Sequence, residues 1–383
     1  MEKRAKFTWD HDPLVYHECG LTGYTGVDPD TIVQMSVLPA KRIQIGPRGL
    51  YKGSLAQLPN GDLVAAVCEF KLKRWPVRIF KSSDLGETWQ ETDHTPLFGK
   101  EPGLNCLENG SLLLTLEDRF VGTVAHSGDG GSTWQITEMK SLLPPLPETG
   151  ILATVRSPIE RPDGTVSLLR CWGHWEGSVN APRSRVWLFH SQDGGRTWPE
   201  REEIETWNDS FFLFAEADFL RLPDNRILAA SRFEFDHPIS GTNPPWPPKS
   251  VPNDHAAGHM VLLESPDEGR TWTPPRDFLN YSEVQGQLTR LKDGRIICTY
   301  TSYHLPFGTA AVVSEDLGKT WNTGHPFQLA ISNATSTGWA TTRQLPDNSL
   351  LTVYALEPYH LEPKEKGTTV FQCVRWNLPE GKK

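Results

Sequence analysis

Residues Ser191 to Trp198 read Ser-Gln-Asp-Gly-Gly-Arg-Thr-Trp, and the spaced pattern Ser-x-Asp-x-Gly-x-Thr-Trp occurs five times in the 383-residue chain. The Asp carboxylate of such a segment can accept hydrogen bonds from backbone N–H groups two or three residues further on, while the Gly provides a positive φ. Strand-like apolar segments precede the copies, so the pattern predicts a turn between two strands and not a catalytic aspartate. The other copies are Ser82–Trp89, Ser127–Trp134, Ser265–Trp272 and Ser314–Trp321.

A second short pattern, an Asn-Gly, Asp-Gly or Asp-Asn pair between apolar segments, occurs six times. Such pairs are the strongest short signal for a β-hairpin. Two hairpins in each unit make a four-stranded antiparallel sheet, and six units predict an all-β, six-bladed β-propeller. The six copies span residues 58–63, 107–112, 161–166, 222–227, 291–296 and 345–350.

The repeats divide the chain into an N-terminal arm, residues 1–47, and a single propeller domain, residues 48–383. The strand-like run 368–376 at the end of the chain predicts that strands from both termini close one blade, which hides open sheet edges. The Pro-rich insertion 236–259 is too long for a simple connection. It is either a lid over the site or a surface loop that packs or contacts a partner.

The net charge of −9 argues against nucleic acid and anionic membranes as partners, because these favour basic surfaces. Residues 1–9 contain no apolar run, so we expect a cytoplasmic protein, or a secreted one whose signal segment is not part of this sequence. The six cysteines are scattered singly, and His255 and His259 lie in a Pro/Gly-rich loop. We therefore expect no metal site and no cofactor. No signal indicates a particular oligomeric state.

The antiparallel strand order puts both kinds of turn on one face of the propeller, so candidate functional residues are sought on the opposite face. Cations there can bind carboxylates, and flat rings can stack on sugars, so these residues predict a carbohydrate substrate that carries a carboxylate. The candidates before the first strand of a unit are Lys52, Glu101, Arg156, Glu216, Glu283, Gln285 and Trp339. Those between the second and third strands are Arg78, His174, Arg232, His237, Tyr303 and His304.

The two repeated patterns resemble the Asp-box, or BNR, repeats of the sialidase-like superfamily, over about residues 51–376. Glu216 ahead of one strand and Arg232 at the end of the next also resemble the Glu…Arg pair of sialidases. In that family the Glu assists a Tyr nucleophile, and the Arg is one of three that hold the substrate carboxylate. The resemblance therefore implies a catalytic Glu216 and a substrate-binding Arg232.

The sequence departs from the sialidase pattern at four places. Lys52 stands where the family has its first arginine, and Trp339 stands where the nucleophilic Tyr belongs. No Asp occurs between Glu69 and Arg78 as the general acid, and no arginine occurs in 305–309. Since Trp cannot ionise or attack an anomeric carbon, we predict that sialidase activity is absent or very weak, unless another tyrosine such as Tyr303 takes the role.

Three functions remain open on the sequence. The first is a glycoside hydrolase for an acidic sugar, with Glu216 catalytic and Arg232 and Lys52 orienting the substrate. The second is a polysaccharide lyase, in which a His or Tyr abstracts the proton beside a uronate carboxyl group. The third is a non-catalytic propeller that binds a glycan or a protein. An unsaturated product that absorbs ultraviolet light distinguishes a lyase from a hydrolase.

Overall fold

The computed structural model describes residues 14–19, 34–69, 75–117, 122–145, 150–153, 155–174, 184–204, 212–234, 258–280, 283–303, 308–332, 338–356 and 369–379. Within these ranges nearly all regular structure is β-strand, with one short 3₁₀ helix at Met139–Leu142. None of the described helical structure is long and apolar enough to cross a lipid bilayer.

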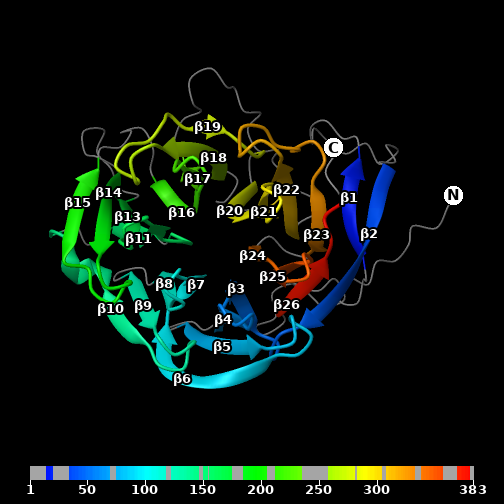
Figure 1. The fold of residues 1–383 in the computed structure, drawn as a ribbon, viewed down its shortest axis with the longest axis horizontal. Coiled ribbons are helices and arrows are strands. Elements are labelled where there is room, and N and C mark those ends of the chain that lie inside the picture. The colour runs from blue at the N-terminus through cyan, green and yellow to red at the C-terminus, as the bar shows by residue number, and fades with distance from the viewer. Residues whose placement is uncertain are drawn as a thin grey trace.

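The strands form six antiparallel blades around a central axis, which confirms the predicted six-bladed β-propeller (Figure 1). Each blade runs from an innermost strand to an outer one. Blade I contains β3 (Leu50–Gln57), β4 (Leu63–Glu69), β5 (Pro76–Ser82) and β6 (Gln90–Phe98). Blade II contains β7 (Lys100–Cys106), β8 (Leu112–Glu117), β9 (Thr123–Ser127) and β10 (Gln135–Glu138). Blade III contains β11 (Gly150–Ala153) and β12 (Ile159–Glu160), then β13 (Val166–His174), β14 (Ser184–Ser191) and β15 (Glu200–Ile204).

The remaining blades follow the same order. Blade IV contains β16 (Phe212–Arg221), β17 (Ile227–Glu234), β18 (Gly258–Ser265) and β19 (Arg276–Asp277). Blade V contains β20 (Glu283–Arg290), β21 (Ile296–Ser302), β22 (Gly308–Ser314) and β23 (Phe327–Ile331). Blade VI contains β24 (Gly338–Gln344), β25 (Leu350–Leu356) and β26 (Val370–Trp376), with β2 (Gln34–Gln44) as its outer strand.

Strands from both ends of the chain close the ring, as the sequence predicts. β2 pairs with β26 from Ala40 opposite Trp376 to Gln44 opposite Gln372. β1 (Leu14–Cys19) pairs with β2 on one side and with β23 of blade V on the other. Blades V and VI therefore belong to one continuous nine-stranded sheet, and the blue and red strands lie together at the right of Figure 1.

The apolar core lies between neighbouring blades. The second strands are buried along almost their whole length, as in β8 and β25, because both sheet faces pack against other blades. The outer strands β6 and β10 are largely exposed and polar. Each apolar cluster draws residues from adjacent blades, such as Leu351 and Phe371 of blade VI with Leu55 and Phe80 of blade I.

The five Ser-x-Asp-x-Gly-x-Thr-Trp segments form the predicted turns between third and fourth strands. In the copy that begins at Ser191, the serine hydroxyl donates to Asp193 Oδ1 at 2.7 Å and accepts from the Gly195 N–H at 2.8 Å. The Thr197 N–H and hydroxyl donate to the two Asp193 oxygens at 2.9 and 2.7 Å. Equivalent bonds from the threonine to the aspartate recur in the other four copies.

Both kinds of turn lie on the same face, which we call the turn face. In blade I, Leu63 at the start of β4 pairs with Gln57 at the end of β3 and with Ser82 at the end of β5. The hairpin turn and the Ser-x-Asp turn are therefore neighbours. The opposite face, where the innermost strands begin, is called the loop face. The predicted insertion joins β17 to β18, and its residues 236–257 lie outside the described ones.

Candidate active site

A β-bulge interrupts the innermost strand of five blades close to its start. The register with the second strand shifts between Leu50 and Gly53, and the equivalent shifts begin at Lys100, Ala215, Val284 and Gly338. A bulge places an extra residue in the strand and redirects its side chain. The residues that directly follow the shift positions, at the loop face, are Tyr51, Glu101, Glu216, Gln285 and Trp339, and Lys52 comes next after Tyr51.

Four of these bulge residues have a left-handed backbone, although none is glycine. The φ angles are 57° at Glu101, 53° at Glu216, 62° at Gln285 and 55° at Trp339. Such a conformation costs free energy in a non-glycine residue and is concentrated at functional sites. Its repetition at one position of four blades marks this ring of residues as the candidate site.

Glu216 is the first charged centre of this ring. Arg232 on β17 donates to Glu216 Oε1 at 3.2 Å, and the two side chains are 8% and 11% exposed, respectively. Among the described residues, Glu216 Oε2 is buried without a hydrogen-bond partner. The structure therefore brings the two residues together as the sequence predicts, with one carboxylate oxygen left as an acceptor.

Lys52 and Glu101 form the second charged centre. Lys52 Nζ lies 2.5 Å from Glu101 Oε1, and both residues are buried. Burial alone would lower the pKa of Lys52, but Glu101, together with Tyr51, Tyr303 and Glu216, holds this pKa well above its usual value. The ammonium is therefore charged at neutral pH and already engaged by a protein carboxylate.

Arg156 and Trp339 lie against each other beside Lys52, whose Nζ is 5.1 Å from the Trp339 ring centroid. The Arg156 guanidinium donates to the Gln285 carbonyl at 3.0 Å and to the Ala340 carbonyl, and it lies 4.4 Å from the Trp339 ring centroid. The Trp339 indole N–H donates to the Pro102 carbonyl at 2.7 Å, and the residue is fully buried. Both side chains thus hold blades together, and protein groups occupy their hydrogen-bond donors.

Tyr303 follows β21 and is buried near both charged centres. Burial raises the pKa of its phenol, and Lys52, Glu216, Arg232 and Glu101 are the charged groups that act on it. The phenol is therefore neutral at pH 7.

Sequence reasoning missed a third group of charges in blade II. Glu117 at the end of β8 pairs in register with Lys100, and Lys100 Nζ lies 3.0 Å from Glu117 Oε1. Glu101 directly follows Lys100 in the chain, so its carboxyl group is a neighbour of Glu117, and each of the two shifts the pKa of the other. The two residues lie on different strands, β7 and β8, and the bulge at Glu101 brings its carboxyl group toward that of Glu117.

The structure does not bring every predicted residue to this site. Arg78 on β5 forms an exposed, bidentate ion pair with Glu91 of the outer strand β6, so it points away from the charged centres. The side chain of His174 lies outside the described part of the structure, as do His237 and His304. Their predicted roles stay predictions. Within the described ranges, no three His, Cys, Asp or Glu side chains are grouped to hold a metal ion.

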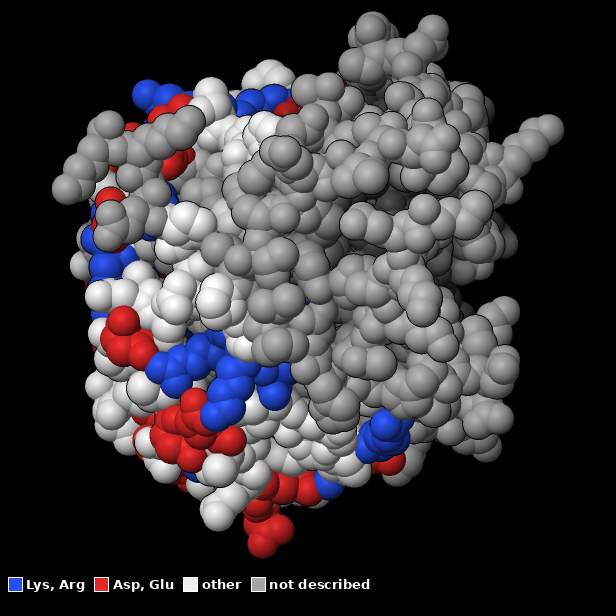
Figure 2. Space-filling model, turned by 90° about the vertical axis from the view of Figure 1, so that its right-hand side faces the viewer, with Lys and Arg blue, Asp and Glu red and all other residues white. Residues whose placement is uncertain are grey.

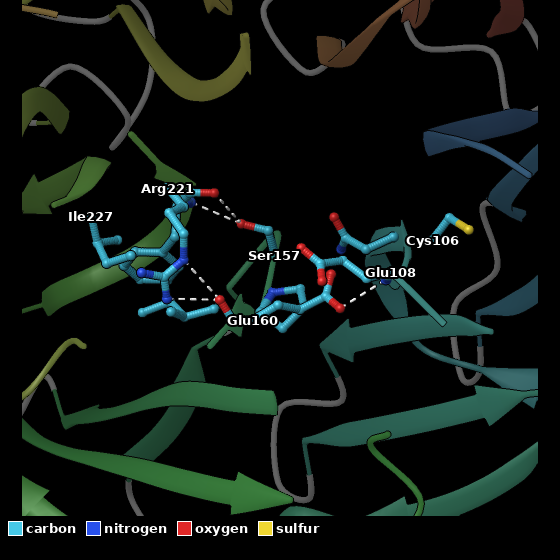
Figure 3. Close-up of a pocket in the computed structure, with 10 residues that line it drawn as sticks. Cys106, Glu108, Ser157, Glu160, Arg221 and Ile227 are labelled. Atoms are coloured by element: carbon cyan, nitrogen blue, oxygen red, sulfur yellow. Dashed lines mark hydrogen bonds between the residues drawn. The ribbon is translucent and has the colours of Figure 1, made fainter. Parts of the chain in front are cut away.

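A cavity of about 220 Å³ lies at the other end of the innermost strands, on the turn face between blades II, III and IV (Figure 3). Its charged groups bind one another: Arg221 donates to the Glu160 carbonyl at 2.7 Å and pairs with Glu268, and Glu160 Oε2 accepts the Glu108 N–H at 2.8 Å. The loop face is the stronger candidate because buried charges and left-handed backbone coincide there.

The side of the molecule next to β1 and β2 carries mixed charge. Figure 2 shows Lys and Arg atoms beside Asp and Glu atoms over the described residues of this side. Ion pairs such as that of Arg375 with Glu87 and Asp347 are of this exposed kind. Such pairs contribute little to stability and do not form a binding site by themselves.

No protein-family model matches the chain. Two sialidases are similar to it in sequence, one from Paraclostridium sordellii and one from Clostridium perfringens. The first is 22% identical over 278 residues, 68% of this chain, and the second is 21% identical over 261 residues, 62% of this chain. The matched region spans 64% of the length of each sialidase.

Several solved structures share the fold. A protein of unknown function from Dyadobacter fermentans has a TM-score of 0.65 at 18% identity, covering 88% of this chain and 98% of its own. An α-L-arabinofuranosidase from Fusarium graminearum has a TM-score of 0.57 at 14% identity, with coverages of 88% and 98%. The intramolecular trans-sialidase from Ruminococcus gnavus has a TM-score of 0.55 at 11% identity, with coverages of 86% and 94%.

At these identities the solved structures show the fold alone. Together, the two sialidase relatives and the propeller neighbours support a sialidase-like superfamily and a fold of the glycoside-hydrolase kind. This agrees with the resemblance drawn from the repeats.

Proposed function

We propose that the protein is a glycoside hydrolase that acts on an acidic sugar at the loop face, with Glu216 as the catalytic carboxylate. The observation that carries the proposal is the environment of Glu216. A left-handed bulge presents this buried side chain, Arg232 holds one of its oxygens, and the described residues give the other oxygen no partner. A strained, buried acceptor is costly for the fold and is typical of a functional group.

Glu216 has two ways to promote cleavage of a glycosidic bond. Its Oε2 can accept the proton of an attacking water, and its negative charge can stabilise an oxocarbenium-like transition state. Arg232 fixes the orientation of the carboxylate and compensates its charge, so the group does not need to reorganise during the reaction.

The cations at the loop face support an acidic sugar. Lys52, Lys100 and Arg232 lie there in a poorly solvated region, where charge interactions are strong. They are the groups that would bind a sugar carboxylate. The contacts differ from those expected on the sequence, because Lys52 and Arg232 each already hold a protein carboxylate.

The two sialidase relatives support glycoside cleavage, but the buried Trp339 does not support the sialidase mechanism. Its ring is fully buried, and its N–H is bonded to the Pro102 carbonyl, so no nucleophile stands at this position of blade VI. We therefore propose an acidic sugar that is cleaved without a tyrosine nucleophile from blade VI.

The lyase alternative has less support within the described residues. A lyase base must be able to take up a proton, but burial raises the pKa of Tyr303, which keeps its phenol protonated at neutral pH. A non-catalytic glycan binder would also use the loop face, and it remains an outcome of the experiment.

The test is incubation of the purified protein with a library of acidic and neutral oligosaccharides, followed by mass spectrometry and ultraviolet absorbance. A hydrolase adds one water to a substrate without a new absorbance. An unsaturated, absorbing product would replace the proposal by the lyase. Retention of an oligosaccharide without any product would replace it by the binder. Glu216→Gln serves as the inactive control, and Glu91→Gln, in the exposed pair with Arg78, serves as the matched active control.

A further inference from the structure

Blades II and IV have the same strand register at the bulge, but the residue beside the bulge glutamate is an acid in blade II and a base in blade IV. In blade IV the residue before the bulge, Ala215, pairs with Arg232, and the bulge residue Glu216 binds this arginine. In blade II the residue before the bulge, Lys100, pairs with Glu117. Glu117 thus occupies in blade II the register position that Arg232 occupies in blade IV. One bulge glutamate faces a guanidinium, and the other, Glu101, faces a carboxyl group.

We infer that Glu117, oriented by Glu101, is the general acid that protonates the leaving-group oxygen in the proposed hydrolysis, opposite Glu216 as the base. This inference rests on the proposed function. It adds a catalytic residue, Glu117, which the sequence pattern does not indicate, and it gives Glu101 the role of a positioning residue.

Glu101 follows Lys100, the register partner of Glu117, so the two carboxyl groups are neighbours. Adjacent carboxylates repel each other, and a hydrogen bond between them requires a proton, because an ionised carboxylate only accepts hydrogen bonds. The pair therefore holds one shared proton. Lys52 lies 2.5 Å from Glu101 Oε1, which favours the charged form of Glu101 and leaves the proton on Glu117. Glu117 has an 11% exposed side chain at the loop face, so the proton is close to the surface that a substrate would approach.

The electrostatics of the pair agree with this assignment. Burial and the neighbouring Glu101 carboxylate raise the pKa of Glu117 to about 8, although Lys100 opposes the shift. Burial would raise the pKa of Glu101 too, but Lys52 and Lys100 lower it well below its usual range. The other titratable groups that act on the pair are Tyr51, Cys68 and Tyr303.

The proton transfer balances as follows. The Glu117 O–H bond breaks, and its proton forms a new O–H bond on the leaving-group oxygen, which keeps the electron pair of the broken glycosidic bond. Water attacks the anomeric carbon and gives a proton to Glu216. Glu117 becomes a carboxylate that Lys100, at 3.0 Å, stabilises. The proton on Glu216 returns to solvent, and Glu117 takes up another before the next cycle.

The shared proton is tested first without any substrate. Protein labelled with ¹³C-glutamate is titrated by NMR, and one glutamate carboxyl should titrate near pH 8. This signal should disappear in Glu117→Gln and move to higher pH in Lys100→Met, because the Lys100 ammonium favours the ionised form. Absence of any glutamate that titrates above about pH 6 would overturn the inference.

The catalytic role is tested with two glycosides of the sugar that the library identifies. Glu117→Gln should lose at least about 100-fold in kcat/KM on the methyl glycoside, but less than about tenfold on the 2,4-dinitrophenyl glycoside, whose leaving group departs without protonation. Glu216→Gln should lose activity on both. Equal losses on both glycosides in Glu117→Gln would overturn the acid role. If the natural protein cleaves no glycoside, the proposed function fails and the acid role with it, while the titration still decides whether the shared proton exists.

Discussion

The Lys52 ammonium lies 2.5 Å from the Glu101 carboxylate, although the two residues belong to different blades and both are more than nine-tenths buried. This contact joins blade I to blade II at the loop face. It also places the predicted substrate-binding lysine against a protein carboxylate. The contact should therefore stabilise the fold, whether or not Lys52 takes part in a reaction.

Replacement of Lys52 by Met should destabilise the protein by about 3–5 kcal/mol, because it leaves the buried Glu101 carboxylate without its partner. The double variant Lys52→Met with Glu101→Gln should recover part of this loss. Urea unfolding measures both values. The control is Arg78→Met, which breaks an exposed pair and should cost less than about 1 kcal/mol. An equal loss of unfolding free energy in Lys52→Met and Arg78→Met would contradict a stabilising role of the buried Lys52–Glu101 pair.

Glu216→Gln should lower turnover of the identified substrate by about a hundredfold or more, the usual loss for a positioned acid–base group. The amide keeps the shape of the side chain and an acceptor for Arg232, so the melting temperature should change little. Kinetics and a thermal melt on the same preparation check this. A variant that melts several degrees lower and keeps its turnover would show that Glu216 only anchors its strand.

Release of sialic acid from an aryl sialoside should be absent or very slow. Trp339→Tyr should not create this activity, because the position is closed by the Arg156 guanidinium and the Pro102 carbonyl. Trp339→Phe should cost about 1–3 kcal/mol of stability, since it leaves a buried carbonyl without its donor. A fluorescent sialoside assay and urea unfolding measure the two effects. Efficient sialoside cleavage by the natural protein would refute the expectation.

The turns predict a loss of stability in acid. Burial would raise the pKa of Asp193, but hydrogen bonds from Thr197, Ser191 and Arg196 outweigh it and lower this pKa to about 2, against about 3.9 in an unfolded chain. Because the folded pKa is the lower one, the contribution of Asp193 is present above about pH 4 and is lost as the pH falls toward 2. Asp193→Asn should therefore be less stable at pH 7, with a gap that narrows in acid. A gap that stays constant across urea unfolding curves from pH 7 to pH 3 would contradict this.

The turns and the blade count were predictable because they depend on local hydrogen bonds. Asp193 binds residues at most four positions away, and that pattern is visible in any eight-residue segment. Even here, the structure adds a detail. The residue after the aspartate also has a positive φ, including Leu85 at 59° and Leu317 at 60°, where the sequence offers no glycine.

The site was predictable only in part, because its geometry depends on contacts between blades. The sequence places Lys52, Glu216 and Trp339 at the starts of innermost strands, and the structure agrees. It does not show the bulges, since nothing local requires Glu101 or Glu216 to adopt a left-handed backbone. The proximity of Glu117 to Glu101 depends on this bulge, so no pattern in the sequence indicates it.

The pairing of β2 with β26 closes the ring, although β2 is synthesised early and β26 late. Ala40 leaves the ribosome long before its partner Trp376, so β2 has no blade VI to pair with until β26 has been made. Non-local pairing of this kind is slow, because loop closure must precede any gain from contacts. We therefore expect ring closure to be the last step of folding. Before β2 pairs with β26, the edge of β26 is exposed, and we expect this species to be the most prone to aggregate.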